Sequence, residues 1–139
     1  MFLLDTNVIS ELRKVKAGRA DAGVAAWAQA VETGSLFISS ISVQELELGV
    51  RLIEPRDATQ GTLLRTWLNT CVLPAFEGRI LSVDPAVAQR SAALHVPDPQ
   101  PLRDGFIAAT ALVHSLVVVT RNVADFKASG VRLLNPWSA

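Results

Sequence analysis

Short apolar runs alternate with longer amphipathic stretches along the chain. The apolar runs are too short for helices and are rich in Leu, Ile, Val and Phe, which predicts β-strands. We expect strands at residues 2–4, 36–38, 79–83, 116–119 and 131–134. The unbroken β-branched run at 117–119 is typical of a strand buried on both faces, and the last strand is expected at an edge of the sheet.

Between these runs, apolar residues recur every three or four positions, which predicts helices. We expect helices at residues 8–14, 21–32, 41–53, 58–72, 84–94 and 102–115. Pro55 and Pro74 are expected to stop the third and the fourth of them. Strands that alternate with helices predict βαβ units around a parallel sheet, so the expected fold class is α/β.

The composition is that of one folded domain, expected to span residues 1–139. Half of the residues are hydrophobic, which excludes a disordered chain. The apolar runs fall well short of the ~20 residues of a membrane span, and no secretory leader opens the sequence, so we expect a cytoplasmic protein. The single cysteine, Cys71, excludes an internal disulfide and a thiolate zinc site, and its helical pattern predicts a buried side chain.

The charges balance, with 13 basic and 13 acidic residues. A free-standing DNA-binding domain usually carries a large basic excess. Any nucleic-acid contact of this chain must therefore be local, through clustered arginines or bound metal ions. The high apolar fraction and the three tryptophans also indicate that a partner covers part of the surface.

Polar residues follow the first predicted strand at once, as Asp5, Thr6 and Asn7. In an α/β protein, ligands bind beyond the carboxyl ends of the strands, so Asp5 is a candidate functional residue. The alternative is that Asp5 or Thr6 only caps the next helix. The choice depends on whether other carboxylates reach the same place.

Two further acids lie on predicted helices among apolar or small neighbours. Glu45 shares a helix face with Leu48, Gly49 and Leu52, where a charge without a partner is costly to desolvate. The alternative for Glu45 is a position at the edge of this face, from which it bends into water. Asp104 stands in the first turn of its helix, so its alternative is a cap or an interaction with the helix dipole.

A fourth acid, Asp125, follows the predicted strand 116–119, and its alternative is a cap on a short helical turn that ends at Gly130. Carboxylates gathered at one edge of a sheet repel one another unless cations are present. Oxygen ligands without cysteine or convergent histidine suit Mg²⁺ or Mn²⁺, which can activate water and neutralise charge on a phosphodiester. His95 and His114 are isolated in the sequence and are weak candidates for a catalytic base.

These motifs, in this order, resemble the PIN-domain ribonucleases, and most of all the VapC/FitB type, the toxins of type II toxin–antitoxin pairs. The motifs are Leu4-Asp5-Thr6-Asn7, Glu45-Leu46 with Gly49, Asp104 before Ile107-Ala108-Ala109-Thr110-Ala111, Thr120-Arg121-Asn122 with Asp125-Phe126, and the ending Gly130-Val131 with Asn135-Pro136-Trp137. They cover essentially the whole chain, and several motifs in agreement are more specific than any single carboxylate.

The resemblance implies a three-layer α/β/α sandwich with a mainly parallel central sheet. It implies a Mg²⁺- or Mn²⁺-dependent endoribonuclease that hydrolyses RNA with a metal-activated water. The catalytic residues and ligands of one or two ions that it implies are Asp5, Glu45, Asp104 and Asp125, with Thr6 and Asn122 as supporting polar groups. Gly105 and the proline-rich segment 97–101 depart from the family pattern, but neither removes an acidic ligand.

The resemblance also implies a set of partners. These are RNA as substrate, a second copy in a homodimer that can join a larger toxin–antitoxin assembly, and an antitoxin whose C-terminal segment blocks the acidic site. DNA is contacted only through the antitoxin, and no membrane is involved. Arg121 is a candidate contact for RNA phosphate, and its alternative is an ion pair with a nearby carboxylate. The tryptophans are expected in core or partner contacts rather than as base-stacking platforms.

Two other functions are compatible with the acidic residues. The first is a catalytically inactive binding module whose acidic pocket only receives a basic side chain of a partner protein. The second is a different phosphoryl-transfer fold with an acidic site, such as that of the haloacid-dehalogenase-like phosphatases. This second function is disfavoured because Asn7 stands where that class has another aspartate, two residues after the first.

Overall fold

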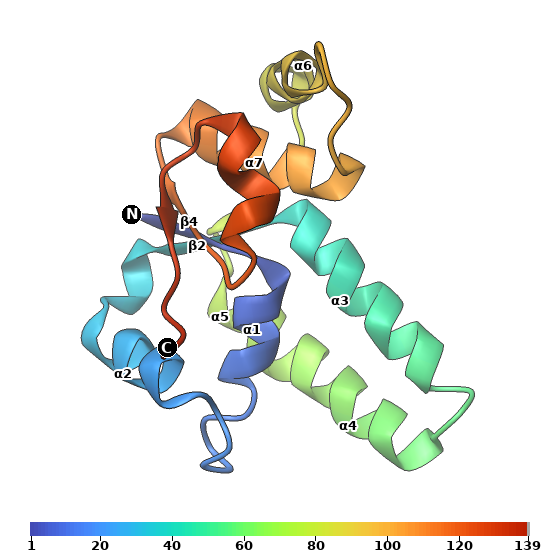
Figure 1. Ribbon diagram of the computed structural model, residues 1–139. Helices are drawn as coiled ribbons and strands as arrows, with labels where there is room; N and C mark the ends of the chain where they lie inside the picture. Colours follow the sequence, from blue (N-terminus) through green and yellow to red (C-terminus); the bar gives the residue numbers. More distant parts are fainter. Residues whose placement is uncertain (139) are drawn as a thin grey trace.

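The computed structural model describes residues 1–138 and contains a five-stranded sheet in which every pairing is parallel (Figure 1). The strands are β1 (Phe2–Leu4), β2 (Leu36–Ser39), β3 (Ile80–Leu81), β4 (Val117–Val119) and β5 (Leu133–Leu134). Their order across the sheet is β3-β2-β1-β4-β5, so β1 is central and a two-residue strand forms each edge. The register places Leu3 beside Phe37 and Val118.

Helices cover both faces of this sheet, which confirms the predicted α/β/α sandwich. They are α1 (Thr6–Leu12), α2 (Ala22–Ala30), α3 (Ser40–Ile53), α4 (Ala58–Trp67), α5 (Leu73–Ala75), α6 (Pro85–Leu94) and α7 (Leu102–His114), with the shorter turns η1 (Thr33–Ser35), η2 (Leu68–Val72) and η3 (Val123–Ser129). Within residues 1–138, no helix combines the length and the hydropathy needed to cross a bilayer.

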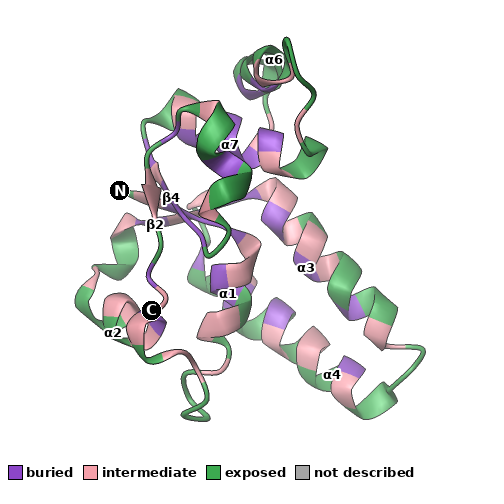
Figure 2. Cartoon of the chain, viewed as in Figure 1, coloured by how far each residue is buried: buried purple, intermediate pink, exposed green. Residues whose placement is uncertain are grey.

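Successive strand residues point to opposite faces of the sheet and so build two separate cores. Leu4 and Val119 pack with α1, α3 and η2, whereas Leu3 and Val118 pack with α7 and η3. Figure 2 shows the buried positions on the strands and on the helix faces turned toward them. Helix α6 stands away from the sheet and packs against α7 (Figure 1). All three tryptophans are partly buried against the first core, as predicted.

Aspartates start several of the helices by accepting backbone N–H bonds that the first turn cannot otherwise satisfy. These caps are Asp21 on α2, Asp57 on α4 and Asp84 on α6. Asp21 also accepts the backbone N–H and the hydroxyl of Ser138, at 3.0 and 2.6 Å. The bonds from Ser138 lower the pKa of Asp21 to about 2 and tie the end of the described chain to α2.

The fourth predicted helix differs from its prediction in two ways. Pro74 does not end it, because α4 continues through the π turn η2 into α5, and Pro74 lies in the first turn of α5. A proline is tolerated there because a first-turn N–H has no acceptor within its helix. Cys71 is exposed rather than buried, because it lies in the π turn, where the helical period changes and the side chains rotate around the axis.

Helices α3 and α4 form a hairpin that an ion-pair network holds together. The Arg65 guanidinium lies 2.7 Å from Glu47 and 3.2 Å from Glu54, and Arg51 pairs with Glu47 at 2.6 Å. These contacts lower the pKa of Glu47 to about 2. The backbones also approach closely, because a Cβ atom at Gly61 would lie 2.7 Å from the Cα atom of Glu54.

This close approach predicts opposite effects for two glycine-to-alanine substitutions in the hairpin. Gly61→Ala should lower the free energy of unfolding by about 1–3 kcal/mol, because the new methyl group meets backbone atoms that cannot move aside. Gly49→Ala, at a position with no heavy atom within 4 Å of the new methyl group, should raise it by up to about 1 kcal/mol through helix propensity. Urea denaturation measures both, and equal effects would contradict the packing described.

Candidate active site

Asp5 directly follows the central strand, and its backbone N–H donates to the Val119 carbonyl at 2.9 Å. The side chain is buried, with 6% of its surface exposed. One carboxylate oxygen accepts the Thr6 backbone N–H at 2.8 Å. The other accepts the Thr120 hydroxyl at 2.8 Å and the Asn7 side-chain amide at 3.3 Å. Asp5 therefore caps α1, which was the alternative interpretation of this residue. Both of its carboxylate oxygens are also fixed at the carboxyl edge of the sheet.

Glu45 extends from α3 toward the same edge and is held by a residue of α1. The Thr6 hydroxyl donates to the Glu45 carboxylate at 2.6 Å and lies 3.0 Å from the Ser42 hydroxyl. The Arg103 guanidinium approaches the other Glu45 oxygen at 3.6 Å. Glu45 does not bend into water, because three quarters of its side chain is buried and bonded inside the site.

Asp104 and Asp125 complete the set, from the first turns of α7 and of η3. Asp104 is half-buried and Asp125 is exposed. Neither acts as a helix cap, since no side-chain bond caps α7 or η3. Within residues 1–138, their carboxylates accept no hydrogen bond.

The buried position of Asp5 changes its ionisation. Burial raises the pKa of Asp5 above its ordinary value, and the charges of Glu45 and Asp125 raise it further. The hydrogen bonds from Thr120 and from the Thr6 N–H act in the opposite direction and favour the charged carboxylate.

The pKa of Asp104 is shifted more clearly. Burial raises the pKa of Asp104 to about 6, and the charges of Asp5, Asp125 and Glu45 contribute to the rise. The four acids therefore repel one another across four structural elements. The fold concentrates negative charge at one point of a chain whose net charge is zero.

The donor set at this edge fits a divalent cation in its chemistry. All four groups are carboxylates, which are hard oxygen donors preferred by Mg²⁺ and Mn²⁺. Their mutual repulsion is what a bound cation would relieve. The side chains are not yet arranged as a ligand shell, since no three Asp, Glu, His or Cys side chains in residues 1–138 form a group that could hold an ion.

The PIN domain family matches residues 2–128. The chain belongs to the PIN-domain family.

Two relatives match the chain over nearly its whole length. "VapC ribonuclease Y4jK" of Sinorhizobium fredii is 37% identical, over 99% of this chain and 98% of the relative. "Toxin FitB" of Neisseria gonorrhoeae is 39% identical, over 99% of both chains. A chain in the solved structure of FitAB bound to an IR36 DNA fragment superposes with a TM-score of 0.88 at 35% identity, over 100% of this chain and 97% of that one. The resemblance to VapC and FitB proteins drawn from the sequence motifs is confirmed.

The other predicted residues of the PIN domain lie at the rim of the site. Asn122 is exposed, and its backbone N–H, rather than its side chain, bonds the Thr120 hydroxyl at 3.0 Å. Arg121 is exposed and makes no ion pair with a carboxylate of residues 1–138, so the ion-pair alternative was wrong. Its guanidinium instead lies 5.5 Å from the ring centre of Trp137.

Three residues with a clear part in the site were assigned no role from the sequence. Thr120 and Asn7 hold Asp5, and Ser42 contacts the Thr6 hydroxyl. The sequence did contain a feature that points to Thr120, because its hydroxyl follows a buried strand. The carboxyl ends of parallel strands meet at one edge of the sheet, where Asp5 also lies. Ser42 gave no such signal, because a serine in a helix most often faces water.

Gly105, which departs from the family pattern, is explained by its neighbour. It is buried, and a Cβ atom here would lie 3.2 Å from Nε2 of His95. The other ring nitrogen of His95 accepts the Gln100 backbone N–H at 3.0 Å. His95 thus fixes the α6–α7 connection and leaves little room for a side chain at position 105.

The repulsion at Asp104 predicts a pH-dependent gain in stability on substitution. The pKa of about 6 in the folded protein exceeds the ordinary value of 3.8, so the fold binds the proton more tightly than the unfolded chain does. The free energy of unfolding should therefore fall as the pH rises from about 4 to about 6. Asp104→Asn should reduce this fall, to which the raised pKa of Asp5 also contributes, and should stabilise the metal-free protein at pH 7 by roughly 1 kcal/mol, after allowance for solvent screening.

Thermal or urea denaturation at pH 4 and pH 7 measures this difference. Asp57→Asn is the matched control, because asparagine caps a helix as well as aspartate does and should change stability little at either pH. A loss of stability in Asp104→Asn at pH 7 would contradict the repulsion.

The hydroxyl of Thr120 supports a second prediction. Thr120→Val should lower the free energy of unfolding by about 1–3 kcal/mol at pH 7, because it removes a donor from the buried Asp5 carboxylate. Thr110→Val is the control, since Thr110 is equally buried but donates only to the Phe106 carbonyl of its own helix. Its cost should stay below about 1 kcal/mol. Similar costs for the two variants would show that the Asp5 contact has no special weight.

Proposed function

We propose that this protein is a metal-dependent endoribonuclease that acts in the cytoplasm as the toxin of a type II toxin–antitoxin pair. The observation that carries the proposal is the set of four carboxylates at the carboxyl edge of the sheet, with Asp5 buried and fixed by hydrogen bonds among them. The reaction is hydrolysis of an RNA phosphodiester bond. The names of its relatives, VapC ribonuclease and toxin FitB, support this assignment.

The four acids, Asp5, Glu45, Asp104 and Asp125, would hold one or two Mg²⁺ or Mn²⁺ ions. Asp5 and Glu45 supply fixed oxygens, whereas Asp104 and Asp125 have no hydrogen bonds to prevent their rotation toward a cation. When bound, the cation supplies Lewis-acid activation of water and neutralises charge that develops on the phosphate.

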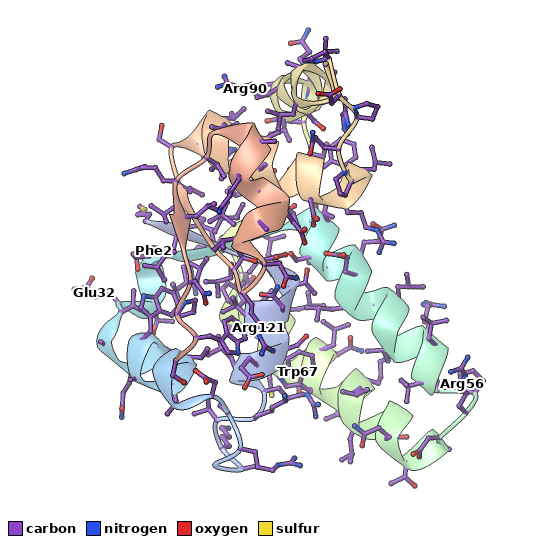
Figure 3. All side chains as sticks on the ribbon, in the orientation of Figure 1. Phe2, Glu32, Arg56, Trp67, Arg90 and Arg121 are labelled. Atoms are coloured by element: carbon purple, nitrogen blue, oxygen red, sulfur yellow. The ribbon has the colours of Figure 1, made fainter. Side chains whose placement is uncertain are left out.

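The other residues position these groups and the substrate. Thr6 orients Glu45, and Thr120 and Asn7 orient Asp5 through the bonds described above. Asn122 supplies a supporting polar group at the rim. Arg121 is exposed near α1 and stacks on Trp137 (Figure 3). We propose that its guanidinium contacts RNA phosphate.

The partners follow from the relatives and from the charge. FitAB bound to DNA and the name toxin FitB support an antitoxin that brings the DNA contact, in agreement with a chain whose net charge is zero. We propose that the protein forms a homodimer, which joins the antitoxin in a larger assembly. Exposed leucines at 48, 52 and 63 on α3 and α4 provide apolar surface for such contacts.

A second candidate is the catalytically inactive module whose acidic pocket only receives a basic side chain of a partner. The lack of a formed metal-ligand group in residues 1–138 is the observation that favours it. The two functions differ in what the carboxylates must do. A nuclease needs their charge for chemistry, whereas a binding module needs it only for attraction.

The proposal predicts that cleavage of single-stranded RNA requires Mg²⁺ or Mn²⁺ and the charges of the acidic site. Asp5→Asn and Asp104→Asn should each lower the cleavage rate by about 100-fold or more, because even groups that only support metal ligands cost about 10–100-fold. Asp57→Asn removes an equal charge at the remote cap of α4 and should cleave like the wild type. Rates measured on a labelled RNA with each metal, and with a chelator, test this.

Growth arrest on induced expression separates the two candidate functions in cells. Arrest by the wild type that vanishes in Asp5→Asn supports the nuclease. Arrest by both proteins would mean that binding alone is toxic and would favour the module. A folded, antitoxin-free wild type that cleaves no RNA with either metal would overturn the nuclease assignment.

A further inference from the structure

A groove opens from the acidic site between α1, α3 and α4, with a cavity volume of about 200 Å³. Thr6 and Glu45 of the acidic site line one end of it. Arg13, Leu64 and Trp67 line the other end. The groove follows α1, whose rise of 1.5 Å per residue puts Arg13 about 10 Å beyond Thr6 along the helix axis.

The far end of the groove combines an aromatic ring with a cation. Trp67 lies where the end of α4 approaches α1, and the Arg13 guanidinium is 5.8 Å from its ring centre (Figure 3). Arg13 makes no ion pair with an acid of residues 1–138. It begins a stretch, 13–19, in which four of seven residues are Lys or Arg and none is acidic.

The other cavity beside the acidic carboxylates is much smaller. The hollow there is lined by Asp104, Asp125 and Gln100, and its volume is about 10 Å³, which is too small for a nucleobase. A strand whose phosphate lies at the carboxylates therefore has room for a neighbouring base on the α1 side. Apolar walls suit the faces of a base, and the exposed guanidinium at the far end suits the next phosphate.

We propose that this groove is a nucleotide subsite, in which a base of single-stranded RNA next to the cut packs against Trp67 and Leu64 while Arg13 contacts the following phosphate. The proposal rests on the proposed nuclease function and deepens it. It assigns to Trp67 a contact with the substrate, in addition to its partial burial against the core.

Gly49 allows the groove to be filled without disturbing the fold. It lines the groove on α3, and a Cβ atom there meets no heavy atom within 4 Å. Gly49→Leu should fold, because leucine is a better helix former than glycine. Gly34→Leu is the matched control, since position 34 is equally open and lies in η1, at the opposite end of the neighbouring strand β2.

The decisive measurement is cleavage of a labelled single-stranded RNA, randomised around the cut, by wild type, Gly49→Leu and Gly34→Leu with Mn²⁺. Gly49→Leu should raise KM about tenfold or more and lose the base preference beside the cut, since stacked bases contribute at about this level. Calorimetric binding of Mn²⁺ alone should be unchanged, because the carboxylates remain. Wild-type KM and base preference in Gly49→Leu would overturn the subsite and leave the groove to a protein partner.

A second variant tests the cation at the far end. Arg13→Gln should lower the slope of log affinity against log salt by about 0.7, the value for one lost phosphate contact with a single strand. Arg90→Gln, on the remote helix α6, removes the same charge and should leave the slope unchanged. An unchanged slope in Arg13→Gln would contradict the phosphate contact.

The subsite and the nuclease can fail separately. If the wild type cleaves no RNA, the proposed function fails, and fluorescence anisotropy of the same RNA still compares its binding to wild type and to Gly49→Leu. Tighter binding to the wild type would then support the groove as an RNA site. Equal binding would overturn it.

Discussion

Like charges held close together are the constraint on which this structure depends. Asp5 is buried at the end of the central strand, and burial together with neighbouring carboxylates disfavours its charge. The hydroxyl of Thr120, the N–H of Thr6 and the amide of Asn7 oppose this effect by donating to it. These donors come from the first turn of α1 and from the residue that follows β4, so the position of β4 beside β1 helps to keep the Asp5 carboxylate charged. The same strand and helix contacts that build the fold therefore also set the charge of the site.

Much of this arrangement could be predicted from the sequence, because it rests on local patterns. Short apolar runs gave the strands, and Asp5 and Asp125 stand directly after or near the ends of two of them. Alternating strands and helices predict a parallel sheet, but they do not say which strand lies beside β1. The hydrogen bond between Thr120 and Asp5 was therefore not predicted. Residues 115 positions apart meet only through tertiary structure.

The errors have equally specific causes. The π turn η2 changes the helical period, so a pattern that assumes an α-helix misplaced Cys71 and stopped the helix too early at Pro74. The contact of Arg121 with the ring of Trp137 was not predicted, because Trp137 lies beyond the last strand, β5. In each case the deciding neighbour is distant in sequence or depends on a non-standard turn. Hydrophobic periodicity carries no information about either.

The shortness of the edge strands limits how this chain can assemble. β3 and β5 have two residues each, so an added strand from another molecule would find very few free backbone groups on either edge. Sheet extension, the route by which many α/β proteins dimerise or aggregate, is therefore poorly available. Helix surfaces are therefore the better place for a partner to bind, and release of such a partner would leave intact the sheet that holds the carboxylates.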